Sequence, residues 1–375
     1  MKIAFLCKRL YMSKDVITDH YGRLYEIPYQ LYQQDHQVVA FSLSYKSKQS
    51  GHCLNYSNQS AGSLDWFSYN LGKLFFPGLL MYVWKVFRHI KHFKPDVLIG
   101  SSDSIHCILT GFIAKQLHIP YVLDLYDNYE SFGLTKIPGV LPLYTHTLKQ
   151  ADAVLCVSQP LANYIKEQYQ SEHTVFVIES TINTDTFYSK NNQECRKILK
   201  LPLEAKLIGL AGALTKERGI ESLYKIFFQL LEESEDKNIF LVLAGIVQKD
   251  LPIPDHKNII YLGELEHAKV VDFFNALDVA VIIIMDNSFG RYSFPQKSYE
   301  ILACDVPVVC SAIGAMNNVL KNHPQSLFSD EHDFLNKTQQ QLDHPCLVDV
   351  NIETWADKSK QIIKILHKLL VAQTP

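Results

Sequence analysis

Short apolar segments alternate with longer amphipathic segments along the chain. Such alternation is typical of βαβ units built around parallel sheets. In the first half, strands are predicted at residues 3–7, 37–43, 94–100, 121–125, 153–157 and 174–178. A second series begins near residue 206, with strands predicted at 207–211, 240–244, 259–262, 279–285 and 307–311. The pattern therefore predicts an α/β protein with two doubly wound sheets.

The segments between these strands predict helices, a loop and a hinge. Helices are predicted at residues 24–34, 105–117 and 354–370, the last lying beyond the second sheet. Residues 46–63 are polar and rich in turn formers, so we expect a mobile loop there. The stretch 180–203 contains Asn191-Asn192-Gln193 and is the expected hinge between the two halves.

Residues 64–93 are apolar and aromatic, and basic side chains accompany them: Lys73, Lys85, Arg88, Lys91 and Lys94. One interpretation is a basic amphipathic helix that lies on anionic lipid. The other is core packing of the aromatic residues with a solvated basic face, which is the more frequent arrangement in proteins.

Size and composition restrict the function classes. At 375 residues the chain exceeds the roughly 250–300 at which single cores stop growing, so we expect two domains. The net charge of −3 gives no basic field for nucleic acid, and no nucleic-acid partner is expected. The eight cysteines form no C-x-x-C pair and the fifteen histidines no H-E-x-x-H spacing, so reduced thiols and no metal site are expected.

The N-terminal apolar run of five residues is too short for a signal peptide. No stretch reaches the roughly 18 apolar residues of a membrane span. We therefore expect a cytoplasmic protein that could also bind peripherally to the inner face of the membrane.

The segment Phe294–Glu300 carries the clearest chemical pattern. Pro295 suits the first turn of a helix, whose free N–H groups and positive dipole end would bind an anion such as a diphosphate. Lys297 and Glu300 are three apart and share one helix face. A carboxylate there can accept two hydrogen bonds from the vicinal hydroxyls of a ribose. The alternative is a surface helix with one Lys–Glu pair, worth a few tenths of a kcal/mol.

An ordered set of motifs extends over almost the whole chain. The first half contains Tyr21-Gly22-Arg23, Asp35-His36-Gln37-Val38, Lys94-Pro95-Asp96-Val97-Leu98, Ile119-Pro120-Tyr121-Val122 and Ala151-Asp152-Ala153-Val154. The second contains Gly212-Ala213-Leu214, Arg218-Gly219-Ile220, Leu262-Gly263, Leu277-Asp278-Val279 and Trp355. In this order they resemble the retaining nucleotide-sugar glycosyltransferases of the GT-B fold, in the large group 1 that includes glycogen synthase and mannosyltransferases.

The resemblance implies a fold and a reaction. The fold would be GT-B: two Rossmann-like, doubly wound domains facing a central cleft, with a C-terminal helix that crosses back to the first domain. Residues 1–185, joined by helix 354–375, would bind the acceptor, and residues 186–353 would bind the donor. The reaction would move a sugar, with retention and without a metal, from a UDP-, GDP- or ADP-sugar to a hydroxyl of a glycan or a polyprenyl- or lipid-linked glycan. No further cofactor is implied.

In the second domain, the resemblance assigns donor binding to a set of residues. Glu300 would hold the ribose, Arg218 and Lys297 would neutralise the diphosphate, and the backbone at Glu264 and Leu265 would frame the base. The remaining donor-binding candidates are Gly212, Leu214, Phe289, Gly290, Ser293, Phe294 and Pro295, together with Gly22 of the first domain.

In the first domain, the segment 123–130 resembles a turn whose histidine lies near the transferred sugar. This chain has Tyr126 at the matching position, followed by Asp127. Asp127 would orient the sugar or the acceptor, unless it only caps a helix or turn. Acceptor contacts are predicted for Ser102, Asp103 and Tyr126.

Three positions depart from the family pattern: Ala213 replaces an arginine, Tyr126 a histidine and Tyr292 an acidic residue. Two alternatives therefore stay open. One is a non-catalytic subunit that binds a nucleotide sugar. The other is an inverting GT-B transferase or a UDP-sugar epimerase, which would need a general base such as Asp127, Asp103, His106 or His20. An oxidoreductase is disfavoured, since no G-x-G-x-x-G follows a predicted strand.

Overall fold

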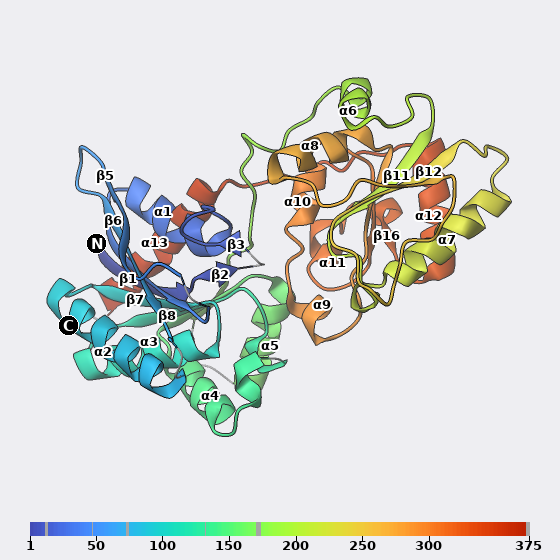
Figure 1. The fold of residues 1–375 in the computed structure, drawn as a ribbon. Coiled ribbons are helices and arrows are strands. Elements are labelled where there is room, and N and C mark those ends of the chain that lie inside the picture. Colours follow the sequence, from blue (N-terminus) through green and yellow to red (C-terminus); the bar gives the residue numbers. More distant parts are fainter. Residues whose placement is uncertain (12–13, 47, 73–74, 132, 170–173, 373–375) are drawn as a thin grey trace. The chain divides into compact units, whose positions relative to one another are not determined.

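The computed structural model describes residues 1–375 except 12–13, 47, 73–74, 132, 170–173 and 373–375 (Figure 1). The contacts divide the chain into two compact units. The first unit comprises Met1–Ser180, Tyr292–Phe294 and Glu353–Pro375, and the second comprises Thr181–Arg291 and Pro295–Ile352.

The first unit is built on an eight-stranded sheet with the order β10-β9-β8-β7-β1-β4-β6-β5. All neighbours are parallel except β5 and β6, which are antiparallel. The strands are β1 Lys2–Lys8, β4 Gln37–Ser44, β5 Gly51–Ser57, β6 Ser63–Asn70, β7 Val97–Ser101, β8 Tyr121–Leu125, β9 Ala153–Cys156 and β10 Thr174–Val177. Two short strands, β2 Leu10–Tyr11 and β3 Lys14–Asp15, pair antiparallel with one another.

Helices cover both faces of this sheet. The helices are α1 Arg23–Gln33, α2 Phe75–Phe93, α3 Ser104–Leu117, α4 Val140–Gln150, α5 Gln159–Tyr169 and α13 Trp355–Ala372, with the 3-10 turns η1 Tyr129–Ser131 and η2 Gly133–Lys136. In Figure 1, α1 and α13 lie above the strands of the first unit, and α2, α3 and α4 lie below them. Trp355, Ile362 and Leu366 of α13 join the core formed by α1 and the sheet. The last helix of the chain thus completes the first unit.

The second unit contains a parallel six-stranded sheet with the order β13-β12-β11-β14-β15-β16. The strands are β11 Lys206–Ala211, β12 Ile239–Ala244, β13 Ile259–Tyr261, β14 Val279–Ile282, β15 Val308–Ser311 and β16 Leu327–Phe328. The helices and 3-10 turns are α6 Asn192–Leu199, η3 Lys216–Arg218, α7 Ile220–Glu233, α8 His267–Ala276, α9 Ser288–Tyr292, α10 Lys297–Leu302, α11 Met316–Val319, η4 Pro324–Ser326 and α12 Glu331–Asp343. Apolar residues of α7 and α12 form one core with alternate positions of β11, β12 and β14.

Two sequence predictions about the first unit are wrong. The predicted loop 46–63 contains β5, and the apolar stretch 64–93 begins with a strand, β6, before α2 starts. β5 is an edge strand that pairs only with β6, and none of its residues is fully buried. Because backbone pairing rather than apolar content defines such an edge strand, its polar sequence resembles that of a loop.

The predicted hinge 180–203 is also partly ordered. Its asparagine-rich part forms the start of α6, where the side chain of Asn191 accepts a hydrogen bond from the N–H of Glu194 at 3.0 Å. Asparagine is a preferred N-cap because its side-chain oxygen satisfies a free helical N–H. The residues that suggested a linker therefore begin a helix.

All eight cysteines are free thiols. Six are buried, while Cys53 of the first unit and Cys346 of the second are partly exposed.

Candidate active site

Three glycines lie at the carboxyl edge of the second sheet, after β11, β12 and β13. The N–H of Gly212 donates to the carbonyl of Ala244, and the N–H of Gly245 to the carbonyl of Gly263, both at 2.8 Å. All three have positive φ, and a Cβ on Gly245 would overlap the carbonyl of Gly212. We call Gly212, Gly245 and Gly263 the glycine shelf. Ligands of such sheets bind at the carboxyl ends of the strands, and backbone without side chains lets them approach closely.

Lys297 and Glu300 lie beside this shelf. A Cβ on Gly212 would be 3.6 Å from Cε of Lys297, so the lysine side chain passes over that glycine. Its Nζ is 4.0 Å from Oε2 of Glu300. Glu300 is only 4% exposed, and burial raises the pKa of its carboxyl group. Within the described parts of the chain, this carboxylate accepts no hydrogen bond. Its oxygens are not among the fully buried polar atoms that lack a partner, so the carboxylate still reaches the surface and can accept hydrogen bonds from a ligand.

The helix that carries these two residues begins later than the sequence predicted. Pro295 is not in the first turn of α10, because the helix starts at Lys297 with Gln296 as its N-cap. Pro295 instead contributes its carbonyl, which accepts from the N–H of Ser298 at 2.8 Å. Since α10 has six residues, its dipole is small. Any anion here is therefore held mainly by side-chain charge.

The loops after β11 and β14 come together at the same edge. The guanidinium carbon of Arg218 lies 5.7 Å from the centroid of the Phe289 ring, within the range of a cation–π contact. A Cβ on Gly219 would be 2.7 Å from Sδ of Met285, so the loop after β14 passes directly against the N-cap of α7. Arg218 itself is exposed and has no carboxylate partner among the described residues, which leaves its charge available.

The other predicted donor-binding residues differ in accessibility. Leu214 is fully buried; its N–H donates to Ile246 and its carbonyl accepts from Gln248. It therefore holds the loop in place. Glu264 is exposed and Leu265 is partly buried, and both follow Gly263 of the glycine shelf.

Around α9, Gly290 is buried, and a Cβ there would overlap the carbonyl of Met285. Ser293 is partly exposed and Phe294 is buried. Their burial gives Gly290 and Phe294 packing roles, whereas Ser293 stays accessible.

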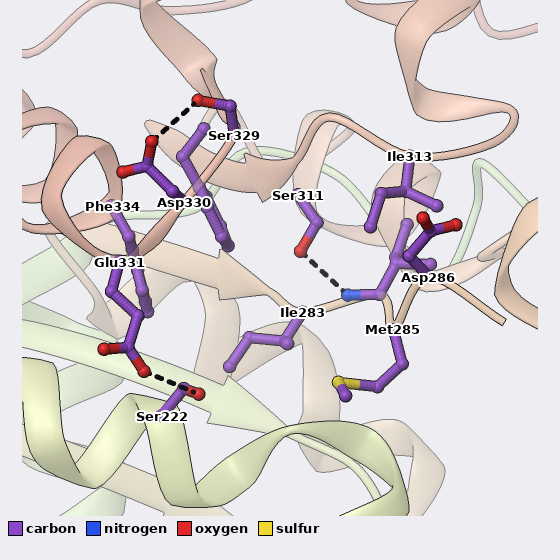
Figure 2. Close-up of a pocket in the computed structure, with 12 residues that line it drawn as sticks. Ser222, Ile283, Met285, Asp286, Ser311, Ile313, Ser329, Asp330, Glu331 and Phe334 are labelled. Carbon is purple, nitrogen blue, oxygen red and sulfur yellow. Dashed lines mark hydrogen bonds between the residues drawn. The ribbon is translucent and has the colours of Figure 1, made fainter.

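A separate cavity of about 200 Å³ lies at the carboxyl ends of β14, β15 and β16 (Figure 2). In Figure 2, Ile283 and Phe334 line its apolar part, and Oγ of Ser311 accepts from the N–H of Ile284 at 3.0 Å. The acidic residues that line it are Asp286, Asp330 and Glu331. Asp286 is paired with Arg291 and Glu331 with Lys225, so these cations are already neutralised. The cavity therefore offers a diphosphate less positive charge than the region around Lys297 and Arg218.

The predicted acceptor residues of the first unit lie together at the carboxyl ends of β1, β7 and β8. The N–H of Lys8 donates to Oγ of Ser102 at 2.7 Å, which joins the ends of β1 and β7. The ammonium of Lys8 is 5.4 Å from the ring centroid of Tyr126. Asp103 caps α3 and also contacts Nδ1 of His106 at 2.8 Å. The structure therefore brings Ser102, Asp103 and Tyr126 together around Lys8.

Asp127 lies in the same group and is 6% exposed. Burial raises the pKa of its carboxyl group to about 7, although the N–H of Asn128 and the charge of Lys8 act in the opposite direction. The carboxylate of Asp127 accepts a hydrogen bond from the N–H of Asn128. The turn that follows is held instead by Oδ1 of Asn128, which accepts a hydrogen bond from the N–H of Glu130. Asp127 therefore does not cap η1. A carboxyl group with a pKa near 7 can hold or release a proton under working conditions.

Asp127 should make the fold less stable at alkaline pH. In the folded protein the pKa of Asp127 is about 7, above the ordinary value of 3.8. Its contribution to the free energy of unfolding is therefore most favourable below pH 4 and is lost as the pH rises through 7. Asp127→Asn should therefore raise the free energy of unfolding at pH 8, by up to about 4 kcal/mol, and change it little near pH 4. Urea unfolding at both pH values measures this. A variant that is less stable than the parent at pH 8 would contradict the assignment.

Gly22 is the N-cap of α1, with φ of 70°. A Cβ at this position would be 2.6 Å from Cε1 of Tyr11, so the ring of Tyr11 fills the space beside the glycine. The contact gives Gly22 a packing role in addition to its turn.

A buried ion pair lies below the acceptor group. Arg23 and Asp124 are both fully buried, and Nε of Arg23 is 3.0 and 3.1 Å from the two carboxylate oxygens. Nη1 of Arg23 donates to the carbonyl of Ile178 at 2.6 Å, and Oγ of Ser101 donates to Asp124 at 2.7 Å. The pair thus fixes the start of α1 against the ends of β7, β8 and β10.

Sequence reasoning missed two residues of the first unit that face the acceptor group, Lys8 and Tyr45. Burial lowers the pKa of the Lys8 ammonium, and Asp103 and Asp127 partly offset this. The hydroxyl of Tyr45 donates to Asp103 at 3.0 Å. Because β1 ends at Lys8 and β4 ends one residue before Tyr45, the rule that ligands bind at strand carboxyl ends could have identified both.

Among the described residues, no group of three or more His, Cys, Asp or Glu could hold a metal ion. No helix in the part of the chain that the structure describes is long and apolar enough to cross a membrane.

Two family models match the chain, one in each half. Residues 24–186 match Glycosyltransferase Family 4, and residues 205–344 match Glycosyl transferases group 1. A glycosyltransferase assigned to teichuronic acid biosynthesis in Bacillus subtilis, TuaC, is 26% identical over 57% of this chain and 52% of its own. D-inositol 3-phosphate glycosyltransferase of Corynebacterium aurimucosum is 21% identical over 51% of this chain and 48% of its own. The chain thus spans about half the length of these curated relatives.

Solved structures agree over the full length. Sucrose-phosphate synthase from Thermosynechococcus elongatus has a TM-score of 0.67 at 15% identity, covering 99% of this chain and 96% of its own. Anabaena HepE, solved in complex with UDP, has a TM-score of 0.63 at 14% identity, covering 100% and 99%. At these identities the likeness shows the fold, and together with the two family matches it confirms the resemblance read from the motifs. The chain has the GT-B fold, with one segment that matches Glycosyltransferase Family 4 followed by one that matches Glycosyl transferases group 1.

Proposed function

We propose that the protein transfers a sugar from a nucleoside diphosphate donor to a hydroxyl of a glycan or lipid-linked glycan, with retention of anomeric configuration and without a metal ion. The observation that carries the proposal is Glu300: a buried carboxylate beside the glycine shelf that accepts no hydrogen bond from the described residues. The vicinal hydroxyls of a ribose would supply two donors to it.

The charges around the shelf support a diphosphate at this place. Lys297 passes over Gly212, and Arg218 is exposed at the start of α7. Two cations beside the leaving diphosphate would stabilise the negative charge that grows on it during transfer. These side chains would supply the charge for which other enzymes use a bound metal.

One neighbour, Anabaena HepE, was solved both with UDP-glucose and with UDP and glucose. We take a UDP-sugar as the first donor to test here, with GDP- and ADP-sugars as the other candidates.

Retention would follow if the departing phosphate takes the proton of the acceptor hydroxyl on the same face of the sugar. That route needs no histidine at Tyr126. In it, Asp127 would orient a sugar or acceptor hydroxyl, and Ser102, Asp103 and Tyr126 would line the acceptor side. Lys8 would join them, because its ammonium lies beside the Tyr126 ring.

The test is donor hydrolysis in the absence of an acceptor. We expect UDP-, GDP- or ADP-sugars to be hydrolysed slowly, with one base clearly preferred, and proton NMR to detect the free sugar first as the anomer of the donor. If the opposite anomer were detected first, the enzyme would invert rather than retain the anomeric configuration. An altered sugar from UDP-GlcNAc alone would indicate an epimerase. Binding of all donors without turnover, with or without glycan acceptors, would identify a non-catalytic subunit and overturn the proposal.

A further inference from the structure

Helix α2 exposes a stripe of large apolar side chains. Phe76, Leu80 and Trp84 follow one another at intervals of four residues and are 74%, 71% and 52% exposed. On the opposite side of the helix, Tyr82, Val86 and Ile90 are buried. Spacing by four places residues on one face of a helix, so α2 is apolar on its outer face as well as on its inner one. Large apolar side chains that are exposed next to one another mark an interaction site more often than scattered ones do.

Basic side chains continue the same outer face. Arg88 follows Trp84 at the next interval of four, and its guanidinium lies 4.7 Å from the Trp84 ring centroid. Lys85 and Lys91 are also exposed. Lys73, which the sequence pattern also includes, lies outside the described residues. The exposed stripe therefore passes from apolar at the start of α2 to cationic toward its end.

The neighbouring elements on this side of the sheet have the same composition. Figure 1 shows α2, α3 and α4 below the strands of the first unit. The sequences of α2, α3, η2 and α4 contain no aspartate or glutamate, although the chain has 39 such residues in all. α3 and α4 add exposed apolar residues, Phe112 and Leu143, and basic ones, Lys115 and Lys149. The charge pattern is uniform over these elements and favours an anionic partner.

We infer that the outer face of α2 docks the protein onto a membrane surface that contains anionic lipids. The apolar residues would enter the boundary between headgroups and acyl chains, and Lys85, Arg88 and Lys91 would contact phosphate groups. A second copy of the chain fits less well. In a symmetric dimer through α2, the copy of α2, α3 and α4 on the partner would offer these three cations no carboxylate, whichever way the two helices run.

Trp84 offers a direct readout. The chain has three tryptophans, and Trp66 and Trp355 are buried whereas Trp84 is exposed. Vesicles of phosphatidylcholine with phosphatidylglycerol should therefore shift the emission of the protein to shorter wavelength, and vesicles of phosphatidylcholine alone should shift it much less. Trp84→Phe should abolish the shift while co-sedimentation with the anionic vesicles persists.

Charge and apolar contact can be separated by variants. Lys85→Gln/Arg88→Gln/Lys91→Gln should weaken co-sedimentation by about tenfold or more, since each basic residue near an anionic surface contributes about 1 kcal/mol. Leu80→Ser should weaken it as well. The matched controls are Lys197→Gln/Lys269→Gln/Lys321→Gln and Leu347→Ser, exposed positions of the second unit, which should bind as the parent does.

Donor hydrolysis in solution, without vesicles, should be unchanged in every α2 variant, which separates a failure of docking from a failure of the proposed transfer. Equal binding to neutral and anionic vesicles, or α2 variants that bind like the parent, would overturn the inference. So would a dimer in sedimentation velocity that Leu80→Ser dissociates, because the apolar stripe would then belong to a second copy.

Discussion

Glu300→Gln is expected to lower kcat/KM for the nucleotide sugar by about 10²-fold or more. The carboxylate would lose two charge-assisted hydrogen bonds to the ribose hydroxyls, each worth about 1.5–3 kcal/mol. The stability of the fold should not fall, because burial raises the pKa of this carboxyl group and the substitution removes a buried charge. Steady-state kinetics and urea unfolding on the same preparations measure both quantities.

A deoxyribose donor makes this test specific. With the parent enzyme, a 2′-deoxy nucleotide sugar should be a much poorer donor than the ribose form, whereas Glu300→Gln should treat the two alike. Glu331→Gln is the matched control, because it removes a carboxylate from the neighbouring cavity of Figure 2 in the same unit. If Glu331→Gln lost activity and Glu300→Gln did not, the donor would lie in that cavity and the assignment of the ribose site would be wrong.

Removing either partner of the Arg23–Asp124 pair is expected to destabilise the first unit by about 3–5 kcal/mol. Both side chains are fully buried, so Arg23→Ala or Asp124→Ala leaves an uncompensated charge in the interior. Arg23→Ala also removes the hydrogen bond to the carbonyl of Ile178, and Asp124→Ala removes the hydrogen bond from Oγ of Ser101. Urea unfolding followed by a probe confined to the first unit would report the change.

The combination Arg23→Met/Asp124→Leu should be more stable than either alanine variant, because it leaves no buried charge unpaired. Asp343→Ala serves as the control, since its partner Lys206 is partly exposed and such pairs contribute about 0–1 kcal/mol. A double variant that is no more stable than either alanine variant would contradict the assignment of the two side chains as a pair.

Much of the fold could be predicted because its strands are buried on both faces. The segment Tyr121–Leu125, buried at all five positions, was predicted with its observed bounds. Continuous apolar runs of this kind are typical of parallel sheets covered by helices. β5 was missed because it lies at the edge and is half exposed. The start of α10 was placed two residues early because proline suits the first turn, although here its carbonyl supports that turn.

The site was predictable where a residue acts through its position at a strand end. Ser102, Asp103 and Tyr126 follow two neighbouring strands, and the structure brings them together with Lys8. The Arg23–Asp124 pair could not be predicted, since its members are 101 residues apart and only the packing of α1 on the sheet joins them. The acidic cavity of Figure 2 is built from four separate segments and carries no motif.

The distribution of thiols has a practical consequence. Because six cysteines are buried, a maleimide dye should react first at Cys53 and Cys346, which lie in different units. The natural sequence thus provides one labelling position on each half of the chain. Energy transfer between two such dyes would report how the distance between the halves changes when a nucleotide sugar is added, without any engineered cysteine.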